Sequence, residues 1–123
     1  MGEIHNLENG HSNRNLRVDS HTSGQYKQTL AALLLFRDKS GWSKYHNLKD
    51  LAISLDLEAS EVLEIFQWKK AGEQLDDKER IHLEEELADV LSYTFFMCDK
   101  LDLDPAKLVA AKTKINNQRT WDI

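Results

Sequence analysis

Four carboxylates in two pairs are the residues of this chain whose types and spacing point most directly to chemistry. Glu58 and Glu61 form an ExxE pair, and Glu86 and Asp89 form an ExxD pair further along the chain. In a helix, residues three apart lie on the same side, so each pair presents a double carboxylate. Four converging anions repel one another and cannot all stay ionised without compensation. Some of them must protonate, pair with basic residues, or bind divalent cations. Their oxygen-only ligand set suits Mg²⁺ or Mn²⁺ and does not suit zinc.

Two helices joined by a short connection would bring these pairs together. Apolar residues recur at helical spacing after the N-cap residue Asn47, and this helix is expected to end at Gly72. The next helix is expected to start after Asp76, with Glu79 in a variant of the capping box, and to run to about Leu101. So short a connection favours antiparallel packing, which turns both acidic strips to one side at one height. The alternative is a solvated charged face, which is usual for a Glu-rich helix.

The helix that carries Glu58 and Glu61 is apolar on two sides, and the carboxylates lie in the seam between them. One side carries a continuous stripe that includes Leu51, Leu55, Val62 and Phe66, whereas the other carries Ile53, Leu57 and Trp68. A helix with two apolar sides needs cover on both. On the facing helix, His82 and Tyr93 line the same strip as the ExxD pair.

A last helix is predicted from Asp104-Pro105, an N-cap followed by proline at N1, to about Arg119. Lys112, Asn116 and Arg119 lie on one face of it, at positions i, i+4 and i+7. Cations and an amide beside a carboxylate–metal cluster are a phosphate-binding combination. The alternative is that the cations complement the dipole at the C-terminal end of the helix.

Aromatic residues flank the helix that carries the ExxE pair. Trp42, Tyr45 and His46 lie in the loop before it, and Phe66 and Trp68 lie near its end. Aromatic side chains beside a polar pocket can stack on a nucleobase. For any one of them, ordinary packing is the alternative explanation.

Length and composition limit the class of protein. The chain has 123 residues, 41% of them hydrophobic, and a formal net charge of −5. This is the size of one domain with enough apolar material for a core, and its acidity is unfavourable for binding a nucleic-acid polymer. Cys98 is the single cysteine, which excludes an internal disulfide and fits a reducing compartment. No apolar stretch is long enough for a membrane span, so we expect a cytoplasmic protein.

The polar residues 1–22 are expected to form a disordered or loosely docked tail before one helical domain at 23–123. The first helix of that domain is predicted from about Ser23 to Lys39. No segment shows convincing alternation of apolar and polar residues with β-branched enrichment. The fold class expected is therefore all-α, with four helices.

Taken in order, these motifs resemble those of the MazG-like nucleotide pyrophosphohydrolases, and most closely the short dCTP-pyrophosphatase branch of that family. The resemblance covers about residues 25–121. It rests on the ExxE…ExxD signature together with Trp42-Ser-Lys-Tyr45-His46, Glu64, Phe66-Gln67-Trp68, Val90 and Lys112-Thr-Lys-Ile-Asn116. Ala59-Ser60 departs from the family pattern of a hydrophobic residue and glycine, and this change removes no ligand.

The resemblance implies a four-helix subunit that assembles into a homodimer or homotetramer around each site. It implies a Mg²⁺-dependent hydrolase that converts a nucleoside triphosphate to the monophosphate and pyrophosphate, for housekeeping of the nucleotide pool. Mg²⁺ would be held by Glu58, Glu61, Glu86 and Asp89; the base pocket would include Trp42, His46 and Trp68; and Lys112 and Asn116 would contact phosphates, with Arg119 as a further candidate. A cytosine deoxynucleotide is the leading substrate, and adenine, uracil and damaged bases are alternatives.

The expected mechanism is attack of a water on the α-phosphorus, with a carboxylate as general base. Glu61 is the first candidate for this base and Glu58 the second. The first rival hypothesis is a non-enzymatic helical interaction module, such as an antitoxin-like or scaffold dimer. The second is a di-iron bundle, which needs two Glu-x-x-His pairs. Glu79-x-x-His82 is one such pair, near the start of its predicted helix, and it has no second pair beside it.

Overall fold

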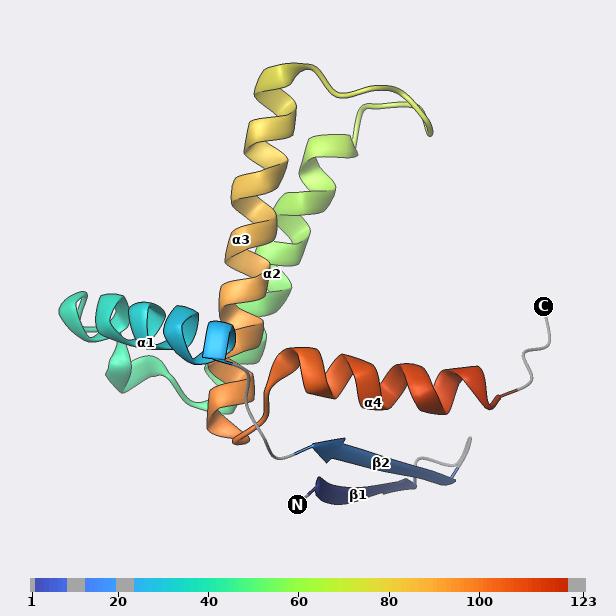
Figure 1. Cartoon of the computed structure of the whole chain (residues 1–123). Coiled ribbons are helices and arrows are strands. Elements are labelled where there is room, and N and C mark those ends of the chain that lie inside the picture. Colours follow the sequence, from blue (N-terminus) through green and yellow to red (C-terminus); the bar gives the residue numbers. More distant parts are fainter. Residues whose placement is uncertain (1, 9–12, 20–23, 120–123) are drawn as a thin grey trace.

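The computed structural model describes residues 2–8, 13–19 and 24–119 of the chain. The helices are α1 (Gly24–Lys39), the short 3-10 helix η1 (Ser43–Tyr45), α2 (Leu48–Phe66), α3 (Asp77–Lys100) and α4 (Pro105–Asn117), and two strands precede them, β1 (Gly2–Glu8) and β2 (Asn13–Asp19). Helices α2 and α3 pack along each other as a long hairpin, and α1 and α4 leave its lower end toward opposite sides (Figure 1). Residues 24–117 therefore form the four-helix, all-α unit expected from the sequence.

The starts of three helices are set by local capping, as predicted. The side chain of Asn47 accepts a hydrogen bond from the backbone N–H of Asp50 at 2.9 Å. Asp76 and Glu79 form a reciprocal capping box with bonds of 2.7 and 2.9 Å. Asp104 caps α4 in the same way, with proline at the first helical position. Each such cap contributes about 1 kcal/mol to helix stability.

The end of α2 differs from the prediction. The helix was expected to reach Gly72, but it ends at Phe66. Gly72 lies in the connection to α3 with a φ of 81°, where the N–H of Glu73 bonds to the carbonyl of Lys70 in a tight turn. The glycine thus serves a turn that needs a positive φ and not a helix terminus. This shortens α2 and places Trp68 in the connection.

The N-terminal segment also differs from the prediction. Strands β1 and β2 pair antiparallel along their whole length, although no strand was expected from the sequence. Val18 of β2 is only 1% exposed, and Nζ of Lys107 in α4 lies 2.9 Å from Oδ2 of Asp19. On the described part of β2, the less exposed Leu16 and Val18 alternate with exposed Arg17 and Asp19, a pattern too short to predict a strand. The boundary predicted between residues 22 and 23 lies outside the described residues.

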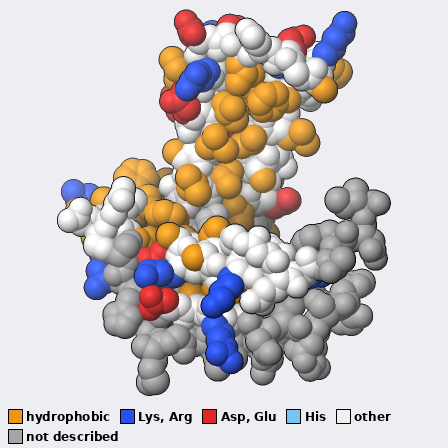
Figure 2. All heavy atoms as spheres, turned by 45° about the vertical axis from the view of Figure 1, so that its right-hand side comes forward, with side chains coloured by type: hydrophobic (Ala, Val, Ile, Leu, Met, Phe, Trp, Pro, Cys, Tyr) orange, Lys and Arg blue, Asp and Glu red, His pale blue; other side chains and the backbone are white. Residues whose placement is uncertain are grey.

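The core of the described chain is small, and the hairpin keeps a large apolar surface. The buried hydrophobic side chains are Val18, Tyr26, Leu51, Phe96 and Cys98. Figure 2 shows a column of hydrophobic side chains along the outside of the hairpin. Large apolar residues of α2 and α3 that remain exposed include Ile53, Leu57, Leu63, Phe66, Ile81, Leu87 and Leu91. The second apolar side of α2, expected from the sequence, is therefore present and is not covered by the described residues.

Among the residues that the structure describes, no helix combines the length and the apolar character needed to cross a membrane.

Candidate functional site

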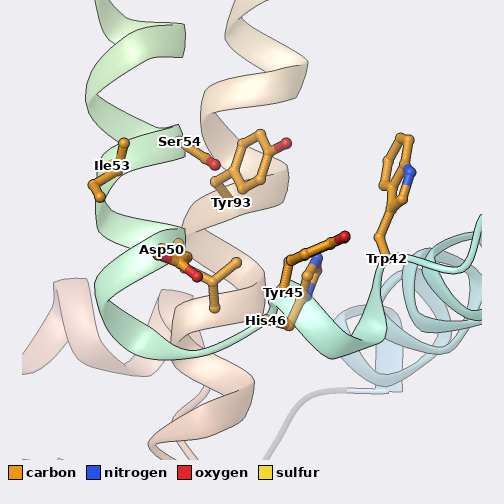
Figure 3. Close-up of a pocket in the computed structure, with 8 residues that line it drawn as sticks. Trp42, Tyr45, His46, Asp50, Ile53, Ser54 and Tyr93 are labelled. Carbon is orange, nitrogen blue, oxygen red and sulfur yellow. The ribbon is translucent and has the colours of Figure 1, made fainter.

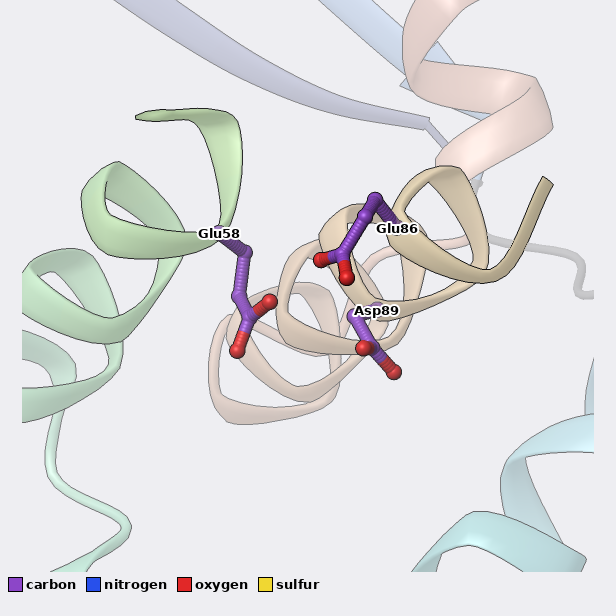
Figure 4. Close-up of side chains that lie close together, drawn as sticks. All are labelled: Glu58, Glu86 and Asp89. Atoms are coloured by element: carbon purple, nitrogen blue, oxygen red, sulfur yellow. The ribbon is translucent and has the colours of Figure 1, made fainter. Parts of the chain in front are cut away.

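Three of the four predicted carboxylates meet in the middle of the α2–α3 hairpin. One carboxylate oxygen from each of Glu58, Glu86 and Asp89 lies within 4.8 Å of the others. Glu58 projects from α2 toward Glu86 and Asp89 on α3 (Figure 4). The antiparallel packing and equal height inferred from the sequence are thus observed. Glu61, the fourth predicted residue, is exposed at the edge of this group, and its carboxyl interacts with both Glu58 and Glu86.

Crowding and burial shift the proton affinity of this cluster. Burial, followed by the negative charge of Glu61 and Asp89, raises the pKa of Glu58 to about 7. The pKa of Glu86 is raised first by its hydrogen bond with the Glu61 side chain and then by burial. Both shifts have the sign expected when carboxylates share a site, because each resists a second negative charge.

Two carboxylate oxygen atoms of the cluster are buried without a hydrogen-bond partner among the described residues. They are Oε2 of Glu58 and Oε2 of Glu86. A buried polar atom left in this state costs about 1–3 kcal/mol. A divalent cation would satisfy both atoms and would also lower the repulsion between the carboxylates. The donor set consists of oxygens only and fits a hard cation such as Mg²⁺ or Mn²⁺.

The Glu79-x-x-His82 pair does not form part of this cluster. Glu79 receives the Lys69 ammonium at 2.7 Å and the backbone N–H of Asp76 at 2.9 Å, at the connection between α2 and α3. These bonds lower the pKa of Glu79 and hold its carboxylate away from a ligand role. His82 instead approaches Glu86, with Nε2 at 3.3 Å from Oε1. The di-iron hypothesis therefore loses the one pair on which it depended.

An aromatic cavity of about 370 Å³ lies between the η1 loop and the hairpin. Its walls come from the loop, from α2 and from α3, and Trp42 stands across the opening from Tyr93 (Figure 3). The lining residues are Trp42, Tyr45, His46, Asp50, Leu51, Ile53, Ser54 and Tyr93. Trp42 and His46, both predicted from the sequence, are thus brought together.

Trp42 and His46 are held in place by other aromatic rings. Trp42 packs edge-on against Phe36 of α1, with ring centroids 5.3 Å apart. His46 is buried and packs edge-on against Phe96 of α3, with ring centroids 4.5 Å apart. Burial lowers the pKa of His46, and the nearby Arg37 and Lys100 lower it further. His46 therefore presents a neutral imidazole at neutral pH.

The aromatic cavity adjoins the carboxylate cluster. Ser54 precedes Glu58 by four residues on α2, and Tyr93 follows Asp89 by four residues on α3. Residues four apart lie on one face of a helix, about 6 Å apart along its axis. The cavity and the cluster therefore lie one helical turn apart in the same seam. The spacing from Asp89 to Tyr93 is the sequence signal that identifies Tyr93, which was not among the predicted base-pocket residues.

The remaining predicted residues are not brought to this seam by the described chain. Trp68 is 90% exposed in the connection after α2 and does not line the cavity with Trp42 and His46. Lys112 and Asn116 are half-buried on α4, which packs against β2 and runs away from the hairpin (Figure 1). Arg119 follows the C-cap residue Gln118, beyond the end of the helix.

Comparisons with known proteins agree with this geometry. Residues 53–122 match the MazG-like family. The chain is 34% identical over 88 residues to dCTP pyrophosphatase 1 of Rattus norvegicus and to that of Homo sapiens, covering 68% of this chain and 52% of each relative. The chain thus spans about half the length of the curated relatives that it matches. A crystal structure of a pyrophosphatase from Archaeoglobus fulgidus is similar with a TM-score of 0.68 and 38% identity, covering 80% of this chain and 94% of that one. The match over more than half of the sequence shows that this chain belongs to the MazG-like family.

Proposed function

We propose that this protein is a nucleoside triphosphate pyrophosphohydrolase that converts a (d)NTP to the (d)NMP and pyrophosphate. The observation that carries the proposal is the carboxylate cluster one helical turn from an aromatic cavity. A nucleotide has an apolar, stackable base and a polyanionic phosphate chain, so it requires these two environments side by side. The names of the similar proteins, dCTP pyrophosphatase and pyrophosphatase, support the same reaction.

Glu58, Glu86 and Asp89 would hold Mg²⁺, with Glu61 beside them and Mn²⁺ as an alternative ion. When bound, the ion would supply positive charge for the phosphate chain and for a water molecule. Glu61 is the proposed general base, because it lies at the open edge of the cluster and outside the three oxygens that lie closest together. It would accept a proton from the water that attacks the α-phosphorus, as the bond from that phosphorus to the bridging oxygen breaks and pyrophosphate leaves. Glu58 is the second candidate for this role.

The aromatic cavity would bind the base. Trp42 and Tyr93 offer ring faces across its opening, and the neutral His46 offers a ring nitrogen at its wall (Figure 3). A cavity of about 370 Å³ holds one base and not a folded nucleic-acid polymer. The similar dCTP pyrophosphatases favour a cytosine deoxynucleotide, and a role in housekeeping of the nucleotide pool, as the first hypothesis.

A second copy of the chain would complete the site. The uncovered apolar column on the hairpin supports assembly into a homodimer or homotetramer. Such an assembly would allow Trp68 of one copy to reach the cavity of another. It would also allow Lys112, Asn116 and Arg119 to contact phosphates held by the neighbouring copy. Light scattering after size-exclusion chromatography tests this step, because a monomer at micromolar concentration would contradict it.

Release of pyrophosphate from a panel of deoxynucleoside and ribonucleoside triphosphates tests the reaction, with Mg²⁺ in one series and EDTA in the other. We expect release only with the metal, a preference for one base, and loss of release in Glu58→Ala. Glu84→Ala is the matched control, because Glu84 lies on the exposed side of α3 and pairs with Arg80. Absence of release from every nucleotide, with Glu58→Ala folded and still associated, would instead support the interaction-module hypothesis.

A further inference from the structure

Glu86 uses its two carboxylate oxygens differently. Oε1 lies 3.3 Å from Nε2 of His82, one helical turn earlier on α3. Oε2 is buried and has no hydrogen-bond partner among the described residues. The imidazole of His82 thus occupies the rim of the cluster and leaves Oε2 as the oxygen that Glu86 offers to its interior.

The contact between His82 and Glu86 is not an ordinary surface pair. Arg80 and Glu84 have the same spacing on the same helix and a similar distance of 3.4 Å, but their side chains are 77% and 65% exposed. A pair of that kind contributes little to stability or geometry. In the pair of His82 and Glu86, the His82 side chain is 56% exposed, but the Glu86 side chain is only 12% exposed, so the neighbours of Glu86 and not bulk water determine its orientation.

Repulsion from the other carboxylates of the cluster favours rotation of the Glu86 side chain toward solvent. The carboxylates of Glu58, Asp89 and Glu61 all lie close to that of Glu86. Without a donor at the rim, the carboxylate would lower its repulsion by rotating toward solvent. Nε2 of His82 carries a hydrogen in one neutral tautomer and in the imidazolium form, so this contact does not require a charged ring.

We propose that His82 is a positioning residue of the carboxylate site: it holds Oε1 of Glu86 so that Oε2 faces a bound divalent cation. The inference rests on the proposed function, because it assigns His82 a role toward the ion that the cluster would bind. Partners that orient ligating carboxylates in this way change metal affinity about 10- to 100-fold when they are removed. His82 does not line the aromatic cavity, and the side chain that it contacts is the proposed ligand Glu86, so its effect should appear in metal affinity.

Direct binding of Mn²⁺ to the full chain, without nucleotide, tests this role. Electron paramagnetic resonance measures free Mn²⁺, and therefore gives a dissociation constant that does not depend on turnover. We expect His82→Ala to raise this constant about 10-fold. His82→Gln places an amide nitrogen near the position of Nε2 and should restore most of the affinity. Arg80→Ala, which removes the matched pair on the exposed side of α3, should bind as the wild type does.

The outcomes separate this inference from the proposed function. Wild-type affinity in His82→Ala, together with lost binding in Glu86→Gln, would overturn the role of His82 and leave the metal site intact. Equal losses in His82→Ala and Arg80→Ala would also overturn it, because the effect would then belong to the helix as a whole. Absence of Mn²⁺ binding by the wild type would overturn the proposed metal site together with this inference. Far-UV circular dichroism checks that each variant keeps its helices.

Discussion

Replacing Glu58 by glutamine should change the stability of the metal-free protein in a pH-dependent way. The pKa of Glu58 is about 7 in the folded chain, against an ordinary value of 4.5. Below 4.5 the carboxyl is protonated in the folded and unfolded states alike, so it carries no penalty. As the pH rises from 4.5 to 7, the unfolded chain gives up this proton first, and the wild type loses stability. Above about 7 the loss is complete.

The size of this effect follows from the same shift. A rise of the pKa from 4.5 to about 7 corresponds to about 3 kcal/mol at full strength. Glu58 is only half-buried, so solvent screening reduces this figure to about 1–2 kcal/mol. Glutamine has nearly the same volume and cannot ionise. We therefore expect Glu58→Gln to be more stable than the wild type by about 1–2 kcal/mol at pH 8 in EDTA, and equally stable at pH 4.5.

Urea unfolding followed by circular dichroism, at several pH values between 4.5 and 8 in EDTA, measures this difference. Glu84→Gln should show no such pH dependence, because Glu84 is 65% exposed and lies outside the cluster. Added Mg²⁺ should stabilise the wild type more than Glu58→Gln. The ion would neutralise the Glu58 carboxylate, and the glutamine variant has no such charge. The reasoning is refuted if Glu58→Gln is less stable than the wild type at pH 8 in EDTA, or if the difference is the same at every pH.

Three further predictions concern single residues. Glu61→Gln should lower turnover by orders of magnitude without changing the helical circular dichroism signal, and full activity in a steady-state assay would exclude Glu61 as the base. Trp68→Ala should weaken nucleotide affinity in a fluorescence titration while leaving the fold intact; an unchanged affinity would remove Trp68 from the base pocket. Lys69→Met removes the ion pairs to Glu73 and Glu79 at the α2–α3 connection, at 3.2 and 2.7 Å. It should lower the thermal midpoint at low salt, by an amount that shrinks in high salt, and an equal loss at both salt concentrations would argue against an electrostatic origin.

Features set by short-range physical chemistry could be predicted from the sequence. Asn47, Asp76 and Asp104 cap their helices because a side-chain oxygen two or three residues away satisfies a free N–H. The convergence of Glu58 with Glu86 and Asp89 follows from helical periodicity and a short antiparallel connection, both of which are local.

Features set by distant contacts could not be predicted. Strand β2 pairs with β1 and packs against α4, and neither contact appears in the local pattern of its residues. Gly72 is compatible with a helix end and with a loop turn, and only the geometry of the connection decides between them. Trp68 continues the helical spacing of α2 in the sequence, yet the helix has already ended at Phe66.

The ion pair between Asp19 and Lys107 has a consequence for how the chain folds while it is being synthesised. Its two residues are 88 positions apart, so a strand made before the α2–α3 hairpin docks on a helix made after it. A two-stranded hairpin is only marginally stable alone. At ribosomal rates of about 5–20 residues per second, β1 and β2 must wait roughly 4–18 s for α4 to be made. During that interval the nascent chain presents an unsupported hairpin, and a chaperone that binds exposed strands would meet it there first.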